Sequence, residues 1–347
     1  MKVVVAMSGG VDSAVSALIL KLKGYEVIGV HFKTERDVFF SDFVLTHKVC
    51  CSPDDTADAK KIAQKLGIEM RIIDLHEEFK RDVISEFIEG YLSGITPNPC
   101  ALCNRRIKFS VLRKIASETN SDFLATGHYS RVENGKIRIA LDRKKDQSYF
   151  LALVKREDVK NLILPIGNYN KNEVRSIAKL NELEISSKPD SQDVCFIPDG
   201  NLKKFFTSQH VKLSPGPIIT TKGDVIGEHS GYQLYAIGQR KGLGVAAGHR
   251  VYVVDIEPAK NAVIVGEREE LFKDRILVRE VNFLEDLPDK IECECKVRST
   301  AKAIPCRVNF GDPTEVHFSE PVIPAPGQIV AFYNGEYLLG GGVITKS

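Results

Sequence analysis

The sequence lacks any apolar run long enough to cross a bilayer, which takes about 20 consecutive apolar residues. Its first apolar run, Val3 to Met7, is short and is broken by Ser8-Gly9-Gly10, so it does not have the apolar stretch of a signal peptide. Internal repeats and low-complexity tracts are absent as well. We therefore expect a protein of the cytoplasm that does not enter a membrane.

An excess of charge of one sign is also missing. Lys and Arg number 48 and Asp and Glu 46, which gives a net charge of +2. This balance neither demands nor excludes a nucleic-acid partner, because local basic patches can hold RNA on a nearly neutral protein. Three such patches occur, and each taken alone is typical of a solvated surface: 105–108, 143–145 and 239–241.

A disulfide framework is not expected for the eight cysteines, because cytosolic cysteines are usually thiols or ligands. The composition, 43% hydrophobic and 27% charged, is typical of a soluble globular protein. A chain of 347 residues is too long for one hydrophobic core, so we expect two or three domains.

The first part of the chain alternates strand and helix patterns. Short β-branched runs predict buried parallel strands, and two of the helical stretches between them stop at Gly24 and Gly67. We predict strands at 2–6, 27–32, 70–75 and 122–126, and helices at 14–23, 57–66 and 77–91. This alternation predicts a doubly wound α/β sheet, which binds its ligand at the carboxyl ends of the strands.

A glycine loop, Ser8-Gly9-Gly10-Val11-Asp12-Ser13, follows the first predicted strand. Its backbone N–H groups and the N-terminus of the next helix can together form an anion site. The loop has neither the Gly-Lys-Ser/Thr of a Walker A motif nor the G-x-G-x-x-G of a dinucleotide fold. A plain glycine turn in which Asp12 or Ser13 caps the helix is the alternative.

The loop resembles the SGGxDS motif of the PP-loop ATP pyrophosphatases, which split ATP between its α- and β-phosphates and form an adenylated intermediate. Further segments, in order along the chain, resemble one family among them, the bacterial tRNA-specific 2-thiouridylases. They are 96–99, 103–104 with 107–109, 125–129, 145–150, 188–191, 195–197 and 238–244. The resemblance runs from residue 6 to about 245 and continues more weakly to the C-terminus.

The resemblance implies a reaction in two stages. ATP with Mg²⁺ adenylates the C2 oxygen of the wobble uridine in the anticodon stem-loop of tRNA, and sulfur then replaces this oxygen, so that AMP and pyrophosphate are released. An amide-like oxygen leaves only after such activation, and the base must leave its stack to be reached. The sulfur implies a partner, either a sulfur-carrier protein or a cysteine desulfurase relay.

The resemblance also assigns site residues, with Asp12 near magnesium or phosphate. The residues that it places around ATP are Ala6, Met7, Ser8, Gly9, Gly10, Val11, Asp12, Ser13, Phe32 and Gly127. Those that it places against tRNA are Asn98 and Pro99, at the target base, and Lys145, Asp146 and Gln147. Many relatives carry Met at the position of Phe32, and either side chain can pack on a purine. Arg298, on the polar face of a predicted strand, is our own candidate for a further tRNA contact, and a solvated arginine fits equally well.

The C-x-x-C pair Cys100 and Cys103 suits a zinc site, an iron–sulfur site or a redox couple by its spacing. By resemblance, Cys103 is the catalytic nucleophile and Cys195 carries a persulfide. Many relatives have Asp where this chain has Cys100. Two mechanisms stay open: transfer from a Cys195 persulfide through a Cys103–Cys195 disulfide, and a [4Fe–4S] cluster held by Cys100, Cys103 and Cys195 with one open iron. Arg105 and Arg106, next to the pair, are expected to face phosphate.

The remaining cysteines predict structural roles. Cys293 and Cys295 lie on the apolar side of a strand pattern in which charged residues alternate, so we expect them in a core, as we do Cys306. Cys50 and Cys51, just before a predicted helix start, are also interpreted as structural.

Beyond residue 200 the helical patterns give way to short strands and turns. We predict three domains: a PP-loop catalytic domain at 1–199, a mixed-β tRNA-binding module at 200–268 and a β-barrel at 269–347.

Two other functions remain to be weighed. Another PP-loop enzyme, such as an ATP-dependent amide synthetase, would use the same loop but needs no thiol at Cys103. A zinc-stabilised RNA-binding module on Cys100 and Cys103 would need two more ligands at short spacing, and the sequence has no second C-x-x-C.

Overall fold

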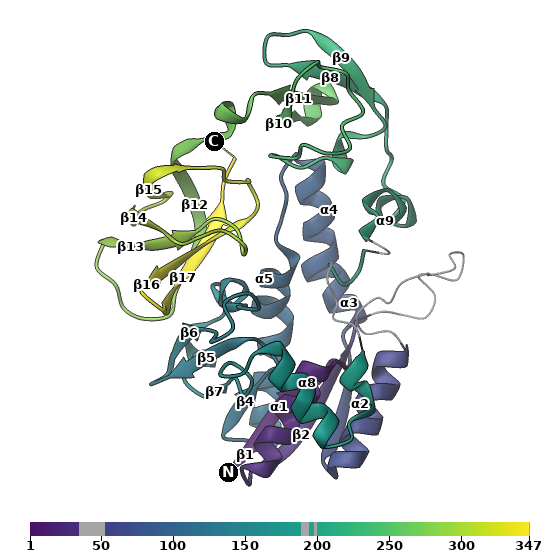
Figure 1. The fold of residues 1–347 in the computed structure, drawn as a ribbon, viewed down its shortest axis with the longest axis vertical. Helices are drawn as coiled ribbons and strands as arrows, with labels where there is room; N and C mark the ends of the chain where they lie inside the picture. Colours follow the sequence, from purple (N-terminus) through teal and green to yellow (C-terminus); the bar gives the residue numbers. More distant parts are fainter. Residues whose placement is uncertain (35–52, 189–193, 198–199, 347) are drawn as a thin grey trace.

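A computed structural model describes residues 1–34, 53–188, 194–197 and 200–346 (Figure 1). Three bodies follow one another along the chain: a parallel sheet flanked by helices, a small mixed sheet and an antiparallel barrel. The predicted fold class is therefore confirmed. No helix within the described ranges is both long and apolar enough to cross a membrane. Cys50 and Cys51 lie outside the described residues.

The first body contains a five-stranded parallel sheet in the order β3-β2-β1-β4-β7. Its strands are β1 (Lys2–Ala6), β2 (Glu26–Lys33), β3 (Glu69–Asp74), β4 (Phe123–Ala125) and β7 (Leu162–Ile163). Val4 of β1 packs in one hydrophobic core, whereas Val3 and Val5 pack in another. Both faces of the sheet are thus covered, as a continuous apolar strand requires.

Three helices pack against the face of the sheet that carries Val3 and Val5. They are α1 (Val11–Leu22), α2 (Pro53–Leu66) and α8 (Lys171–Leu180). Two longer helices each contain a π-helical segment. The first consists of α3 (His76–Phe79), η1 (Lys80–Ile84) and α4 (Ser85–Leu92), and the second of α5 (Pro99–Cys103), η2 (Asn104–Lys108) and α6 (Phe109–Glu118). Such segments often occur at functional sites, and periodicity alone does not reveal them.

Short elements complete the first body and lead into the second. They are the β5 (Ser130–Glu133) and β6 (Lys136–Ile139) hairpin, η3 (Ser148–Leu151), α7 (Arg156–Val159), η4 (Glu184–Ser187) and α9 (Leu202–Ser208). The second body is a mixed sheet with a core of its own, in the order β10-β11-β8-β9. Its strands are β8 (Gly216–Thr220), β9 (Val225–His229), β10 (Tyr252–Glu257) and β11 (Ala262–Gly266).

The third body is a closed antiparallel barrel in the order β12-β15-β14-β13-β16-β17, which closes where β12 also pairs with β17. Its strands are β12 (Lys273–Phe283), β13 (Lys290–Lys296), β14 (Ile304–Asn309), β15 (Thr314–Val322), β16 (Ile329–Asn334) and β17 (Tyr337–Ile344). The β5–β6 hairpin extends the barrel sheet, because Arg138 of β6 pairs with Tyr337 of β17. This junction between the first and third bodies is not part of the sequence-based prediction.

Candidate active site

The predicted phosphate loop connects β1 to α1. The side chain of Ser13 closes the loop: its Oγ accepts from the Ser8 N–H at 3.1 Å and donates to the Gly10 carbonyl oxygen at 3.0 Å. Gly9 has a φ of +77°, and a Cβ there would lie 2.3 Å from the Asp55 carbonyl oxygen, so only glycine fits. Gly10, rather than Asp12 or Ser13, is the N-cap residue, and no side chain caps α1. The N–H groups at the start of α1 therefore remain available to an anion.

Asp12 is held at this helix start by two side chains from later in the chain. The Tyr129 hydroxyl donates to Asp12 Oδ1 at 2.8 Å, and Lys171 Nζ contacts both carboxylate oxygens at 2.8 and 2.9 Å. Lys171 also lies over the Tyr129 ring, 5.7 Å from its centroid. Neither Tyr129 nor Lys171 was among the predicted ATP-binding residues. Lys171 belongs to no motif, and no local pattern indicates that it reaches Asp12.

A second lysine contacts the other side of the loop. Lys188 Nζ donates to the Gly9 carbonyl oxygen at 3.0 Å and lies 2.5 Å from Asp55 and 2.6 Å from Asp58. Burial opposes the charge on Lys188, but its hydrogen bonds to Asp55 and Asp58 outweigh this effect and raise its pKa. The phosphate loop is thus flanked by two ammonium groups, those of Lys171 and Lys188, which suit a polyphosphate ligand.

The sheet order reverses between β1 and β4, and this is where doubly wound sheets bind their ligands. Gly127 follows β4 at that edge, and a Cβ there would lie 2.8 Å from the Ser13 nitrogen. Met7 is buried, and its carbonyl oxygen accepts from His31 Nδ1 at 2.8 Å. The structure therefore brings the predicted stretch 6–13 together with Gly127. Phe32 lies at the same end of the sheet on β2 but is buried in a hydrophobic core.

The C-x-x-C pair lies on α5, just before the π-helical segment. Asn98 is the N-cap residue, and its Oδ1 accepts from the Ala101 N–H at 3.0 Å. Pro99 is buried at the first helical position, Cys100 is exposed and Cys103 is half-buried. Because Asn98 and Pro99 determine where this short helix starts, they also determine where both thiols lie.

Cys195 packs on the same hydrophobic core as Cys103, although most of its neighbouring loop lies outside the described residues. The next residue, Phe196, packs in this core. Its ring makes edge contacts with Phe79 and Phe87, at 5.8 and 5.2 Å between centroids. Within the described ranges, no three His, Cys, Asp or Glu side chains converge as a metal-binding group.

The chain matches known proteins along its whole length. Residues 1–199 match the family described as "tRNA methyl transferase HUP domain", 204–267 the "tRNA methyl transferase PRC-barrel domain" and 273–344 the "Aminomethyltransferase beta-barrel domain". The chain is 45% identical to "tRNA-specific 2-thiouridylase MnmA" of Pseudothermotoga lettingae, over 100% of this chain and 99% of the relative. The MnmA proteins of Fervidobacterium nodosum (46%; 99% of each chain) and Thermotoga maritima (44%; 100% and 99%) are similar. The chain belongs to the tRNA-specific 2-thiouridylase family.

The segment 145–147, predicted to contact tRNA, forms hydrogen bonds with neighbouring parts of the first body. Asp146 accepts from the Ala140 N–H at 2.9 Å and from the Ser148 hydroxyl at 2.8 Å. Gln147 exchanges two hydrogen bonds with the Tyr129 backbone, at 2.7 and 2.9 Å. The side chains of Asp146 and Gln147 thus form hydrogen bonds within the first body.

Arg298 follows β13 and is half-buried. Its guanidinium lies beside Gly238, where a Cβ would be 3.0 Å from Arg298 Nη2. Gly238 begins the Gly-Gln-Arg-Lys-Gly segment that carried the resemblance in the second body. Arg298 thus lies where the second body and the barrel meet.

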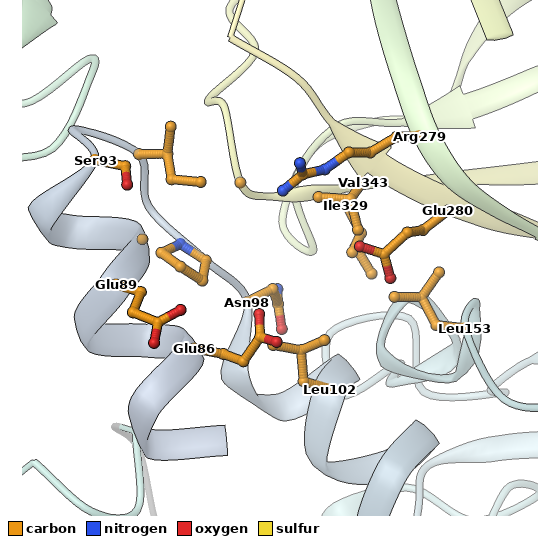
Figure 2. A pocket seen from close by; sticks show the side chains of 14 residues that line it. Glu86, Glu89, Ser93, Asn98, Leu102, Leu153, Arg279, Glu280, Ile329 and Val343 are labelled. Atoms are coloured by element: carbon orange, nitrogen blue, oxygen red, sulfur yellow. The ribbon is translucent and has the colours of Figure 1, made fainter. Parts of the chain in front are cut away.

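Arg105 and Arg106 both form ion pairs with carboxylates. Arg105 lies 3.0 Å from Glu280 of the barrel, and Arg106 lies 2.8 Å from Glu86 of α4. Figure 2 shows Glu86 and Glu280 on opposite walls of a pocket between α4, α5 and the barrel. The expectation that these two arginines face phosphate stays a prediction, and the structure adds the acidic side chains that the fold brings beside them.

The barrel cysteines are core residues, as predicted. Cys295 and Cys306 are buried, and Cys293 packs against the barrel core. Cys293 Sγ lies 3.6 Å from Cys306 Sγ across the β13–β14 pair. Contact with Cys306 and burial raise the pKa of the Cys293 thiol, which disfavours a reactive thiolate.

Proposed function

We propose that this chain catalyses the ATP-dependent 2-thiolation of the wobble uridine of tRNA. The proposal is based on two features that occur together in the first body. One is a phosphate loop without a side-chain cap, flanked by Lys171 and Lys188. The other is the packing of Cys103 and Cys195 on the same hydrophobic core. The full-length relatives name thiolation, whereas the domain descriptions name methyl transfer. Two thiols in the same body as a phosphate loop favour thiolation, and a tRNA substrate fits a reaction in the cytoplasm.

In the first step the uridine C2 oxygen attacks the α-phosphorus of ATP. The bond from the α-phosphorus to the bridging oxygen breaks, pyrophosphate leaves, and the uridine N3 proton is lost to solvent. The α1 N-terminus, Lys171 and Lys188 stabilise the charge on the phosphates. Asp12 supplies the kind of oxygen ligand that Mg²⁺ prefers, and the ion, when bound, neutralises phosphate charge.

In the second step the terminal sulfur of a Cys195 persulfide attacks C2, and AMP leaves with the oxygen. The Cys103 thiolate then attacks Cys195 Sγ, the S–S bond to the transferred sulfur breaks, and 2-thiouridine and a Cys103–Cys195 disulfide remain. An external thiol reduces this disulfide and a sulfur-carrier protein or cysteine desulfurase relay restores the persulfide. The alternative in this proposal is a [4Fe–4S] cluster held by Cys100, Cys103 and Cys195, with one open iron that presents sulfide.

The substrate requires contacts beyond the phosphate loop. Asn98 and Pro99 lie at the start of the helix that carries Cys103, toward the target base, and Lys145 and Arg298 supply cations for the tRNA backbone. Asp146 and Gln147 support this surface through internal hydrogen bonds. In this proposal 1–199 performs the chemistry, and 200–268 and 269–347 help to hold the tRNA.

The test incubates the purified chain with ATP, a persulfide donor, a thiol reductant and unmodified tRNA. We expect pyrophosphate release and 2-thiouridine in the digested nucleosides, and loss of 2-thiouridine in Cys103→Ser and Cys195→Ser. Activity of Cys103→Ser on an amide-forming reaction would instead support an amide synthetase, and a methylated uridine formed after addition of a methyl donor such as S-adenosylmethionine would support methyl transfer.

Cys100→Ser separates the two sulfur mechanisms. The persulfide route predicts that this variant keeps its thiolation rate and that protein purified without oxygen carries no stoichiometric iron or labile sulfide. Iron in the wild type that disappears in Cys100→Ser, together with lost activity, would establish the cluster route.

A further inference from the structure

Gln328, just before β16 of the barrel, forms hydrogen bonds with the segment that leads into α5. Gln328 Nε2 donates to the carbonyl oxygens of Thr96 at 2.8 Å and Pro97 at 3.3 Å, while its Oε1 accepts from Asn98 Nδ2 at 3.1 Å. The amide of one side chain thus binds three consecutive residues. These contacts join positions about 230 residues apart in the sequence.

Close packing holds the same segment from two sides. The Thr96 N–H donates to the Pro326 carbonyl oxygen at 2.8 Å, and a Cβ on Gly327 would lie 2.8 Å from the Thr96 carbonyl carbon. On the other side, a Cβ on Gly90 of α4 would lie 2.1 Å from Pro97 Cγ. Residues 96–98 are therefore fixed between α4 and the barrel, beside the pocket in Figure 2, where Asn98 is labelled.

The amide of Asn98 is used at both of its ends. Its Oδ1 caps α5 through Ala101, and its Nδ2 donates to Gln328. Because Asn98 caps the helix that begins with α5, a shift of this cap moves the start of that helix, which carries Cys103. We propose that Gln328 is a positioning residue, through which the barrel sets the place of the Cys103 helix for sulfur transfer. This inference rests on the proposed thiolation only for its catalytic consequence.

Gln328 uses two N–H groups and one oxygen, which is why a glutamate cannot replace it. Gln328→Glu keeps the acceptor for Asn98 but puts a carboxylate against two carbonyl oxygens. The matched control is Gln64→Glu, the same change on the exposed face of α2. Three quantities are measured for each variant: kcat and KM for tRNA in thiolation, the iodoacetamide alkylation rate of the Cys103 peptide, and the melting temperature.

For Gln328→Glu we expect kcat to fall about tenfold or more, as small displacements of a reacting group cost at least that much. KM for tRNA should stay near the wild-type value, and alkylation of half-buried Cys103 should speed up several-fold while that of buried Cys295 does not. Gln64→Glu should match the wild type in all three quantities. Wild-type kcat and wild-type Cys103 alkylation in Gln328→Glu would overturn the inference, as would a loss confined to KM.

Two further measurements keep the inference decidable. If Gln328→Glu does not fold, Gln328→Met, which adds no charge, is measured in the same way and judged by the same outcomes. A double-mutant cycle with Asn98→Ala should show coupling between the two positions, and additive effects would contradict a direct link. If the wild type makes no 2-thiouridine, the proposed function fails, while the alkylation rates still decide whether Gln328 positions Cys103.

Discussion

The carboxylate of Asp12 receives hydrogen bonds from Tyr129 and Lys171, and the backbone of Tyr129 is bonded to Gln147 of the predicted tRNA-contacting segment. A single tyrosine therefore links that segment to the phosphate loop. Hydrogen bonds to a charged group are stronger than those between neutral groups, so this contact should influence how Asp12 is oriented.

Tyr129→Phe removes the hydrogen bond to Asp12 and keeps the ring. We expect tRNA-dependent pyrophosphate release to fall about tenfold, since a hydrogen bond to a charged group is worth about 1.5 kcal/mol or more. Tyr25→Phe is the control, because the Tyr25 ring packs on Phe123 at the opposite end of the sheet. Equal rates in Tyr129→Phe and the wild type would contradict the link.

The burial of His31 predicts that the free energy of unfolding depends on pH. Burial lowers its pKa, helped by Lys188 and opposed by its hydrogen bond to Met7 and by Asp55. The unfolded chain binds a proton near pH 6.5, while folded His31 does so only at lower pH, so the stability it confers is full above about pH 6.5 and is lost as pH falls below it. In His31→Asn, urea unfolding should show a shallower fall in unfolding free energy between about pH 7 and 5. Parallel pH curves for the two proteins would refute this.

At the scale of the elements, α5 and α9 begin with asparagine caps of the same geometry. Only α5 also carries Cys103, the proposed nucleophile. Asn98 accepts from the Ala101 N–H and Asn201 from the Lys204 N–H, both at 3.0 Å. Replacing either by Ala should cost about 1 kcal/mol of stability, measured by chemical denaturation. Only Asn98→Ala should also lose most of the thiolation rate, because α5 carries Cys103. Similar activity losses in both variants would show that cap stability alone explains the effect.

On the scale of the whole molecule, the proposed tRNA contacts come from different parts of the chain, Lys145 of the first body and Arg298 of the third. Each phosphate contact that a lysine makes contributes to the salt dependence of tRNA binding through counterion release. Lys145→Gln should lower the slope of log Kd against log salt concentration by about one, which is measured by filter binding over a salt series. Lys60→Gln, on the exposed surface of α2, should leave the slope unchanged. An unchanged slope in Lys145→Gln would remove Lys145 from the tRNA surface.

The local patterns of the sequence were sufficient to predict most of the helices and strands. The β-branched run of β1, the glycine loop and the alternation that buries Cys293 and Cys295 were all predicted, because each depends on residues close together in the chain. The π-helical segment after Cys103 was not predicted, since it has the same apolar periodicity as an α-helix over so few residues.

By itself, the sequence determined the α/β class and located the loop and the cysteines that we propose to bind phosphate and to carry sulfur, because strand pattern, glycine spacing and motif order are local or sequential properties. Only the tertiary structure decided three sets of contacts: the ion pair of Lys171 with Asp12, the ion pairs of Arg105 and Arg106 with acidic residues, and the hydrogen bond between Gln328 and Asn98. These contacts join residues that are distant in the sequence or on separate elements. Their partners are selected by how the elements pack, which no local pattern encodes.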